Sequence, residues 1–181
     1  MFKGLIRRRI AAFEKQANYD ASYMREILDV DPKAVMALGR MTAIGGYRRD
    51  IPLAPWHAAK ITSAIDGDCG PCTQLAVGMA EAAGVDPDLI RTVVAGDVAT
   101  LPADVALTVR YARAVLARDV EADELREHIH ERWGPGAPIS LAYGIAAAQF
   151  YPMLKFGLGH GSACVRLRVG GADMPVLREA A

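Results

Sequence analysis

The sequence predicts an all-α protein of about eight helices, and three observations favour this fold class. Apolar residues recur three and four positions apart along most of the chain, as they do on one face of an α-helix. The 52% hydrophobic content comes mostly from alanine, leucine and valine, which suits closely packed helices. Asp-Pro pairs and glycines supply helix start and stop signals between these segments. At 181 residues we expect one domain over 1–181, with a less regular tail at 159–181.

Five helices are expected in the first half of the chain, over residues 2–13, 23–28, 32–45, 56–65 and 70–83. Basic residues between regularly spaced apolar ones predict that the first helix is amphipathic. The second ends at Asp31-Pro32, where an aspartate cap and a first-turn proline begin the third. Prolines precede the fourth helix, and Asp66-Gly67-Asp68 breaks it. Gly84 ends the fifth.

The second half is expected to contain a short helix over 89–93 and longer ones over 103–116, 122–133 and 138–152. Asp86-Pro87 repeats the start signal before the short helix. Acidic residues early and Arg132 late favour the third of these helices, because they complement the helix dipole. We expect Pro152 to kink or end the last one. Only 164–169 alternates like a strand, and we find no partner for it in the sequence.

Composition narrows the classes of partner. With 21 basic and 21 acidic residues, the chain has no net field that would draw it to nucleic acid or an anionic membrane. The apolar run 139–158 contains a glutamine, a proline and a lysine, so we interpret it as a buried helix rather than a membrane span. Three cysteines are too few for a secreted disulfide scaffold, and the basic N-terminus lacks the apolar core of a signal peptide. We expect a cytoplasmic protein, and its alanine-rich helix faces favour a homo-oligomer.

Most of the chemistry lies at Cys69 and Cys72, which fall in the first turn of the expected helix over 70–83. A helix N-terminus presents unpaired amides and the positive end of the dipole, which favour the reactive thiolate. Cys69 is the better placed of the two for this effect. Once Cys69 has attacked a peroxide, Cys72 lies one turn away and can condense with the sulfenic acid to form a disulfide. The pair can then cycle if a thiol reduces it.

Other interpretations of the pair stay open. Cysteines are often buried without a function, so inert packing is one of them. Zinc needs two further ligands, and none of the four histidines forms a second pair with suitable spacing, so we expect neither a metal nor a cofactor. The motif Cys-Gly-Pro-Cys also occurs in thioredoxins, but there it follows a β-strand, and nothing upstream here is strand-like.

Several polar residues near the pair in sequence are candidate helpers. His57 is the candidate general base, and the alternative is a partly exposed histidine beside Trp56. Asp66 and Asp68 are more typical of turns and caps, and as anions they disfavour a neighbouring thiolate. Gln74 can act only as a hydrogen-bond partner. We expect Glu81 to face solvent.

The order of a helix, an Asp-Gly loop, Cys-x-x-Cys at the start of a second helix and then Ala-Gly-Val-Asp-Pro-Asp-Leu-Ile resembles the carboxymuconolactone decarboxylase-like superfamily. The resemblance is to its alkylhydroperoxidase D (AhpD)-like branch in particular. The likeness is densest over 56–94, and the segment 151–160 is also similar to the final helix of some members. It implies an all-helical fold, a homo-oligomer, and a cysteine pair that reduces hydroperoxides with electrons from a protein partner.

The chain also departs from that branch. The histidine that usually follows the second cysteine by four residues is replaced by Ala76. A glutamate about a dozen residues before the first cysteine corresponds to His57 or its neighbour, and a histidine there is a possible substitute for it as a base. The resemblance favours Cys72 as the attacking cysteine, whereas the dipole argument favours Cys69.

The sequence therefore predicts a thiol-dependent oxidoreductase with Cys69, Cys72 and His57 at its site. Its expected substrate is a small hydroperoxide or disulfide, and its expected reductant is a protein or a small thiol. One alternative is a non-catalytic binding or assembly protein of the same fold. Another is a lactone-decarboxylase-like enzyme without thiol chemistry, which needs a pocket lined by His57 and an arginine.

Overall fold

The prediction of an all-α fold is confirmed. The computed structural model describes residues 2–161 and 167–174, and nine α-helices account for most of them. In chain order the elements are α1 (Phe2–Ala17), α2 (Ser22–Val30), α3 (Pro32–Gly46), α4 (Leu53–Asp66), α5 (Gly70–Ala82), α6 (Pro87–Ala95), the 3₁₀ turn η1 (Val98–Thr100), α7 (Ala103–Ala117), α8 (Glu121–Trp133), α9 (Gly136–Gly157), β1 (Arg168–Val169) and β2 (Ala172–Asp173).

The two Asp-Pro signals begin helices as predicted. The carboxylate of Asp31 accepts a hydrogen bond from the backbone N–H of Lys33 at 2.9 Å, at the start of α3. Asp86 accepts one from the N–H of Asp88 at the same distance, at the start of α6. Each contact satisfies one of the N–H groups that a helix N-terminus leaves without an intrahelical partner.

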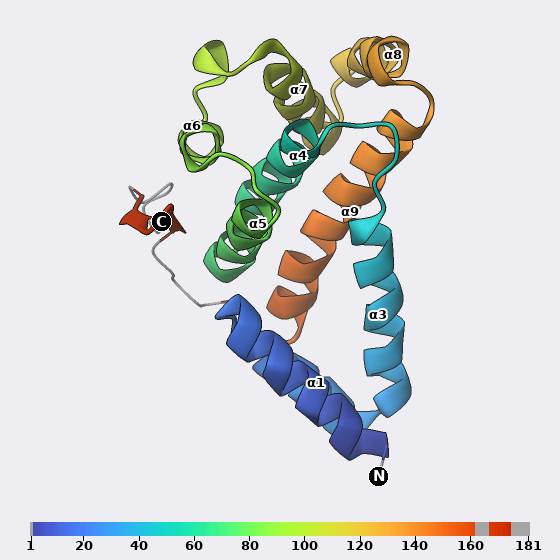
Figure 1. Cartoon of the computed structure of the whole chain (residues 1–181). Helices are drawn as coiled ribbons and strands as arrows, with labels where there is room; N and C mark the ends of the chain where they lie inside the picture. Colours follow the sequence, from blue (N-terminus) through green and yellow to red (C-terminus); the bar gives the residue numbers. More distant parts are fainter. Residues whose placement is uncertain (1, 162–166, 175–181) are drawn as a thin grey trace.

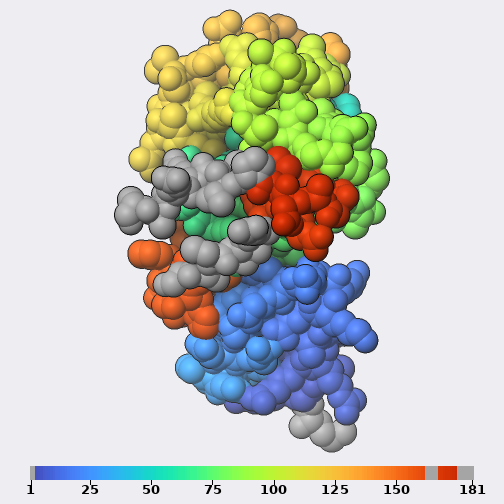
Figure 2. Space-filling model, turned by 90° about the vertical axis from the view of Figure 1, so that its left-hand side faces the viewer, coloured from blue at the N-terminus to red at the C-terminus, as the bar shows by residue number. Residues whose placement is uncertain are grey.

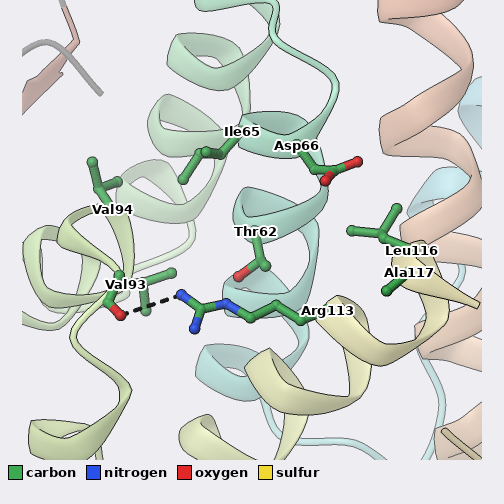
Figure 3. A pocket seen from close by; sticks show the side chains of 9 residues that line it. Thr62, Ile65, Asp66, Val93, Val94, Arg113, Leu116 and Ala117 are labelled. Atoms are coloured by element: carbon green, nitrogen blue, oxygen red, sulfur yellow. Dashed lines mark hydrogen bonds between the residues drawn. The ribbon is translucent and has the colours of Figure 1, made fainter. Parts of the chain in front are cut away.

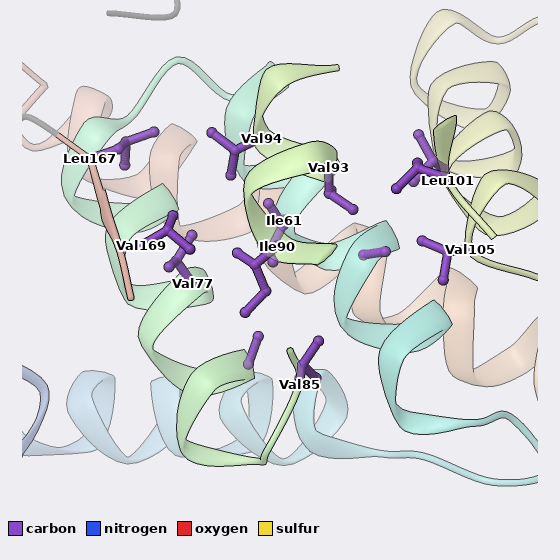
Figure 4. Packing of buried hydrophobic residues seen from close by; sticks show 13 residues of the cluster. Ile61, Val77, Val85, Ile90, Val93, Val94, Leu101, Val105, Leu167 and Val169 are labelled. Atoms are coloured by element: carbon purple, nitrogen blue, oxygen red, sulfur yellow. The ribbon is translucent and has the colours of Figure 1, made fainter. Parts of the chain in front are cut away.

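Helix α4 is the centre of the fold. Every residue from Pro55 to Ala64 is buried, and the helix packs most extensively against α7 and α9. Figure 1 shows α9 running between α4 and α3. One side of α4 contributes Ala58 and Ile61 to an apolar cluster with α5, α6 and α7 (Figure 4). Another side contributes Trp56 to a second cluster with α7, α8 and α9.

The N-terminal helices pack at one end of this core. α1 and α2 supply the buried Ile10, Tyr23 and Leu28, which form a third cluster with partly buried residues of α5 and α9. Figure 1 shows α1 lying across the lower ends of α3 and α9. The cluster also encloses Lys155, which is only 4% exposed and whose ammonium lies 5.1 Å from the ring centre of Tyr19.

The last helix is longer than expected, because α9 continues past Pro152 to Gly157. A proline inside a helix removes one backbone hydrogen bond, which favours a kink or an end. Here Pro152 is buried, and its ring packs so closely on Gly67 that a Cβ atom there would lie 2.9 Å away. Packing against the loop before α5 offsets the lost bond. None of the helices in residues 2–161 is both long and apolar enough to cross a membrane.

The expected strand lies near the C-terminal end and has a partner that the sequence did not suggest. β1 pairs with β2 in antiparallel register, with Val169 opposite Ala172. Gly170 and Gly171 form the turn, both with positive φ (59° and 80°), a conformation that glycine adopts without strain. The first part of the expected strand, including Cys164, lies outside the described residues. Figure 2 shows this hairpin, in red, lying against the helices of the middle of the chain.

Candidate functional site at the start of α5

The two cysteines meet where α4 turns into α5. Only residues 67–69 separate the two helices, and Cys69 is the N-cap of α5. Its sulfur accepts the backbone N–H of Cys72 at 3.4 Å, and Pro71 occupies the first turn. The two cysteines are joined as a disulfide, with their Cα atoms 5.2 Å apart. Both cysteines therefore lie at the start of α5.

The two sulfur-bearing side chains differ in exposure. Cys72 is 8% exposed and faces the interior, whereas Cys69 is only half-buried. Asp66, the last residue of α4, and Asp68, in the loop, are both exposed, and Asp68 has a positive φ of 48°. The turn position expected for Asp68 is present, whereas Asp66 still belongs to the helix. A small molecule that approaches the pair meets Cys69 first.

Helix α9 fixes the loop that carries Cys69. The side-chain amide of Gln149 donates to the backbone carbonyl of Ser63 at 2.7 Å and to the carboxylate of Asp66 at 3.1 Å. One turn further along α9, Pro152 packs on Gly67. These contacts hold the end of α4 and the entry to α5 against one rigid element. Sequence analysis missed this role of Gln149, because the two segments lie more than 80 residues apart.

The C-terminal hairpin of β1 and β2 is hydrogen-bonded to α5. The amide of Gln74 donates to the carbonyl of Arg168 at 3.0 Å and accepts its N–H at 2.7 Å, so it bonds the backbone as a neighbouring strand would. Glu81, which is only half-buried, accepts the N–H of Gly170 at 2.6 Å, so this side chain at the solvent-facing side of α5 also holds the hairpin. Arg91 of α6 donates to the carbonyl of Val169 at 3.1 Å.

His57 lies elsewhere on α4. It precedes the end of the helix by nine residues, about 13 Å along the axis. Its ring is 3% exposed and packs edge-on against Trp56, 4.8 Å between ring centres. The apolar residues around it are Ala54, Ala58, Ile61, Val85, Leu89, Ile90 and Val93. Neither cysteine is among them.

The electrostatics of His57 follow from this burial. Its Nδ1 is buried and has no hydrogen-bond partner in the described part of the chain. Burial, together with the smaller effects of the positive charges of Lys60 and Arg48, lowers the pKa of His57 to about 4. The ring is therefore neutral at pH 7. In the alternative interpretation His57 is a partly exposed histidine beside Trp56; the ring does pack on Trp56, but it is buried.

Lys60 is a second buried polar group on α4. Its ammonium donates to the carbonyl of Gly45 at 3.0 Å and lies 4.0 Å from the ring centre of Trp56. Burial lowers the pKa of Lys60 to about 8. The contact places a cation at the C-terminal end of α3, where the helix dipole favours it.

A cavity of about 290 Å³ lies beside the C-terminal part of α4, between α6 and α7 (Figure 3). It is lined by Thr62, Ile65, Asp66, Val93, Val94, Gly96, Arg113, Leu116 and Ala117. Arg113 reaches across it and donates to the carbonyl of Gly96 at 3.2 Å. The cavity contains an arginine but not His57, so the pocket that a lactone-decarboxylase-like enzyme needs is not formed by these two residues.

Two further findings bear on the site, one structural and one from comparison with known proteins. Within residues 2–161 and 167–174, no three histidine, cysteine or acidic side chains come together as a metal site would require. Searches with the whole chain against family models, curated proteins and solved structures found no match. The resemblance to the AhpD-like branch therefore stays a prediction. Ala76, at the position of the missing histidine, packs against the apolar cluster of α4 to α7.

Proposed function

We propose that the protein is a thiol-dependent oxidoreductase in which Cys69 and Cys72 cycle between a dithiol and a disulfide. The observation that supports it is the pairing of the two sulfurs at the N-terminus of the 13-residue helix α5. In the reduced protein, the N–H of Cys72 and the positive end of the helix dipole stabilise a thiolate on Cys69. A stabilised thiolate attacks hydroperoxides and disulfides and is also a good leaving group.

The proposed cycle balances with a hydroperoxide and a thiol. The Cys69 thiolate attacks the terminal oxygen of ROOH, the O–O bond breaks, and Cys69 becomes a sulfenic acid while the leaving alkoxide takes a proton from water to give the alcohol ROH. The Cys72 thiol then attacks the Cys69 sulfur, which releases water and forms the disulfide. Two thiol groups of an external reductant reduce this disulfide through a mixed disulfide and are themselves oxidised.

The assignment of Cys69 as the attacking cysteine rests on access. Cys69 is half-buried and caps the helix, whereas Cys72 is 8% exposed behind it. Cys72 is one helical turn away, which suits a resolving thiol. We assign no step to His57, because its neutral ring lies among apolar residues of α4 and α6.

The alternative is a binding or assembly protein in which the disulfide serves structure. Two observations favour it: Ala76 leaves no relay histidine beside the pair, and the C-terminal hairpin is fastened to α5 by Gln74 and Glu81. In that case the disulfide stiffens the helix start on which the hairpin rests. The two proposals differ in whether the Cys69–Cys72 disulfide is repeatedly reduced and formed again.

Hydroperoxide consumption separates them. The purified protein is supplied with cumene hydroperoxide and dithiothreitol, and consumption above the uncatalysed rate is measured for the wild type, Cys69→Ser, Cys72→Ser and Cys164→Ser. We expect at least about a 100-fold loss of this rate for the first variant, because it lacks the nucleophile. Cys72→Ser turns over more slowly than the wild type, because dithiothreitol must resolve the sulfenic acid in place of Cys72, whereas Cys164→Ser, the matched control, keeps the wild-type rate. Equal rates for all four proteins would contradict the proposal.

A further inference from the structure

The cavity between α4, α6 and α7 combines an apolar wall with a charged side. Most of the wall is apolar, and Val93 and Val94 of α6 are only 4% and 2% exposed. The polar residues that line it are Thr62, Asp66 and Arg113. Asp66 and Arg113 are exposed, so the cavity meets solvent on the side where these two charges lie. A molecule that fits this space therefore needs an apolar body and a polar end.

Arg113 supplies a fixed positive charge at this cavity. Figure 3 shows its side chain extended from α7 toward the end of α6, where the guanidinium donates to the carbonyl of Gly96 at 3.2 Å. Gly96 is the C-cap of α6, and the helix dipole favours a cation there. The bond fixes the orientation of the guanidinium but uses only one of its five N–H donors. Among the described residues no carboxylate forms a salt bridge with Arg113, so its other donors are open to an anion.

Asp66 limits the negative charge that such an anion can carry. Figure 3 shows Asp66 and Arg113 on either side of Thr62, and the Asp66 carboxylate accepts the amide of Gln149 at 3.1 Å. A second anionic group on the ligand would be repelled by this carboxylate. A phosphate monoester carries nearly two negative charges at pH 7, which one guanidinium does not balance. The charges of the cavity therefore favour a ligand with a single carboxylate.

The volume of the cavity sets the size of the ligand. Liquid water allots about 30 Å³ to each molecule. By this measure the cavity of about 290 Å³ has room for about ten non-hydrogen atoms. Octanoate has this size, and so do small arylalkanoic acids. Both place one carboxylate at the end of an apolar body.

We propose that this cavity binds a small monocarboxylic acid with an apolar body. The carboxylate accepts hydrogen bonds from the remaining N–H groups of Arg113, whose planar guanidinium suits two parallel bonds to one carboxylate. The apolar body lies against Ile65, Val94 and Leu116. None of the residues that line the cavity is a cysteine or a histidine, so the acid is bound and not chemically changed. The inference therefore goes beyond the proposed redox cycle.

A titration of the isotope-labelled full chain with octanoate, followed by the NMR shifts of its backbone amides, tests the site. We expect saturable binding with a Kd on the order of 1 mM, which is ordinary for a ligand of about ten non-hydrogen atoms. The shifted amides should be those around the cavity, in residues 62–66, 93–96 and 113–117. Octylamine lacks the carboxylate and octanedioate adds a second one, so each should bind at least about tenfold more weakly.

Three variants assign the binding to the proposed contacts. Arg113→Leu removes the charged donor and should raise the Kd for octanoate at least about tenfold. Arg110→Leu makes the same change at an exposed position of the same helix, outside the cavity, and should leave the Kd unchanged. Ala117→Phe keeps Arg113 but fills the cavity, so it should also raise the Kd. Circular dichroism checks that the variants fold, and Ala117→Phe tests the site even if the loss of Arg113 disturbs α6.

Three outcomes would each overturn the proposal. They are no saturable binding of octanoate up to about 10 mM, equal binding of octylamine, and a Kd that both Arg113→Leu and Ala117→Phe leave unchanged. Arg113 would then serve only to cap α6. Octanoate is not a hydroperoxide, and its binding is measured without a thiol reductant, so this proposal and the redox cycle can fail separately.

Discussion

Helix α4 and the loop that follows it carry the predicted site residues in opposite surroundings. Beyond its C-terminal end the chain reaches Cys69 through an exposed loop that α9 holds with Gln149 and Pro152. Nine residues before that end, His57 is 3% exposed and surrounded by apolar side chains. His57 and Cys69 lie near one another in sequence, but access decides which of them can react with a small molecule. The proposed redox chemistry belongs to the loop after α4, whereas we expect buried α4 to contribute to stability.

The two regions also differ in how their polar groups are satisfied. The Cys69 sulfur accepts a backbone N–H, and the neighbouring carboxylate of Asp66 accepts the amide of Gln149. Within buried α4, the Nδ1 of His57 lacks a hydrogen-bond partner among the described residues, and the ammonium of Lys60 lies over the indole ring of Trp56. The free energy of unfolding of the protein should therefore depend on pH through these buried groups of α4.

The largest effect we expect concerns His57. Its pKa is about 4 in the folded protein and about 6.5 when unfolded, so between these values the unfolded chain binds a proton that the folded one does not. This contribution is fully present above pH 6.5 and is lost as pH falls toward 4, about 3 kcal/mol in all. His57→Leu should remove this pH dependence while leaving hydroperoxide consumption within about twofold of the wild type.

Urea unfolding from pH 4 to 7 checks the first part of this prediction, and the consumption assay checks the second. Carboxylates titrate in the same interval, so the informative quantity is the difference between wild type and variant. His128→Leu, at an exposed position of α8, is the matched control and should keep the wild-type slope. A large loss of activity in His57→Leu, with its stability intact, would show that His57 takes part in catalysis. The contrast between buried α4 and the loop after it would then be wrong.

The fold was more predictable than the surroundings of its polar residues. Asp31-Pro32 and Asp86-Pro87 mark helix starts through local backbone chemistry, and the position of Cys69 at a helix start is equally local. The burial of His57 depends on α6, and the contact of Glu81 depends on a hairpin 89 residues later. Pairings over such distances leave no spacing pattern in a single sequence.

Reducing the disulfide should have a smaller effect on stability. A bond that closes a loop of four residues restricts the unfolded chain only slightly, which corresponds to about 2 kcal/mol. Urea unfolding with and without a dithiol reductant measures the difference. The Cys69→Ser protein is the control, because the reductant should no longer change its stability. A loss of folding on reduction would show that the Cys69–Cys72 disulfide serves structure rather than the proposed redox cycle.

The smallest effect is expected at the hairpin contact. Gln74→Leu removes two hydrogen bonds to Arg168 and should lower the unfolding free energy by about 1 kcal/mol. Amide exchange over residues 167–174 should become about tenfold faster, while exchange in α4 stays unchanged. Gln16→Leu, at an exposed position of α1, should change neither quantity. Unaltered exchange in Gln74→Leu would mean that Glu81 and Arg91 hold the hairpin without it.

The most direct test of the redox cycle counts thiols after a single exposure to peroxide. The fully reduced protein is given a small excess of hydroperoxide, quenched with iodoacetamide, and its mass and labelled cysteines are determined. The account predicts that Cys69 and Cys72 escape labelling as a disulfide, that Cys164 is labelled, and that a thiol reductant restores all three. Labelling of all three cysteines after the exposure would contradict it.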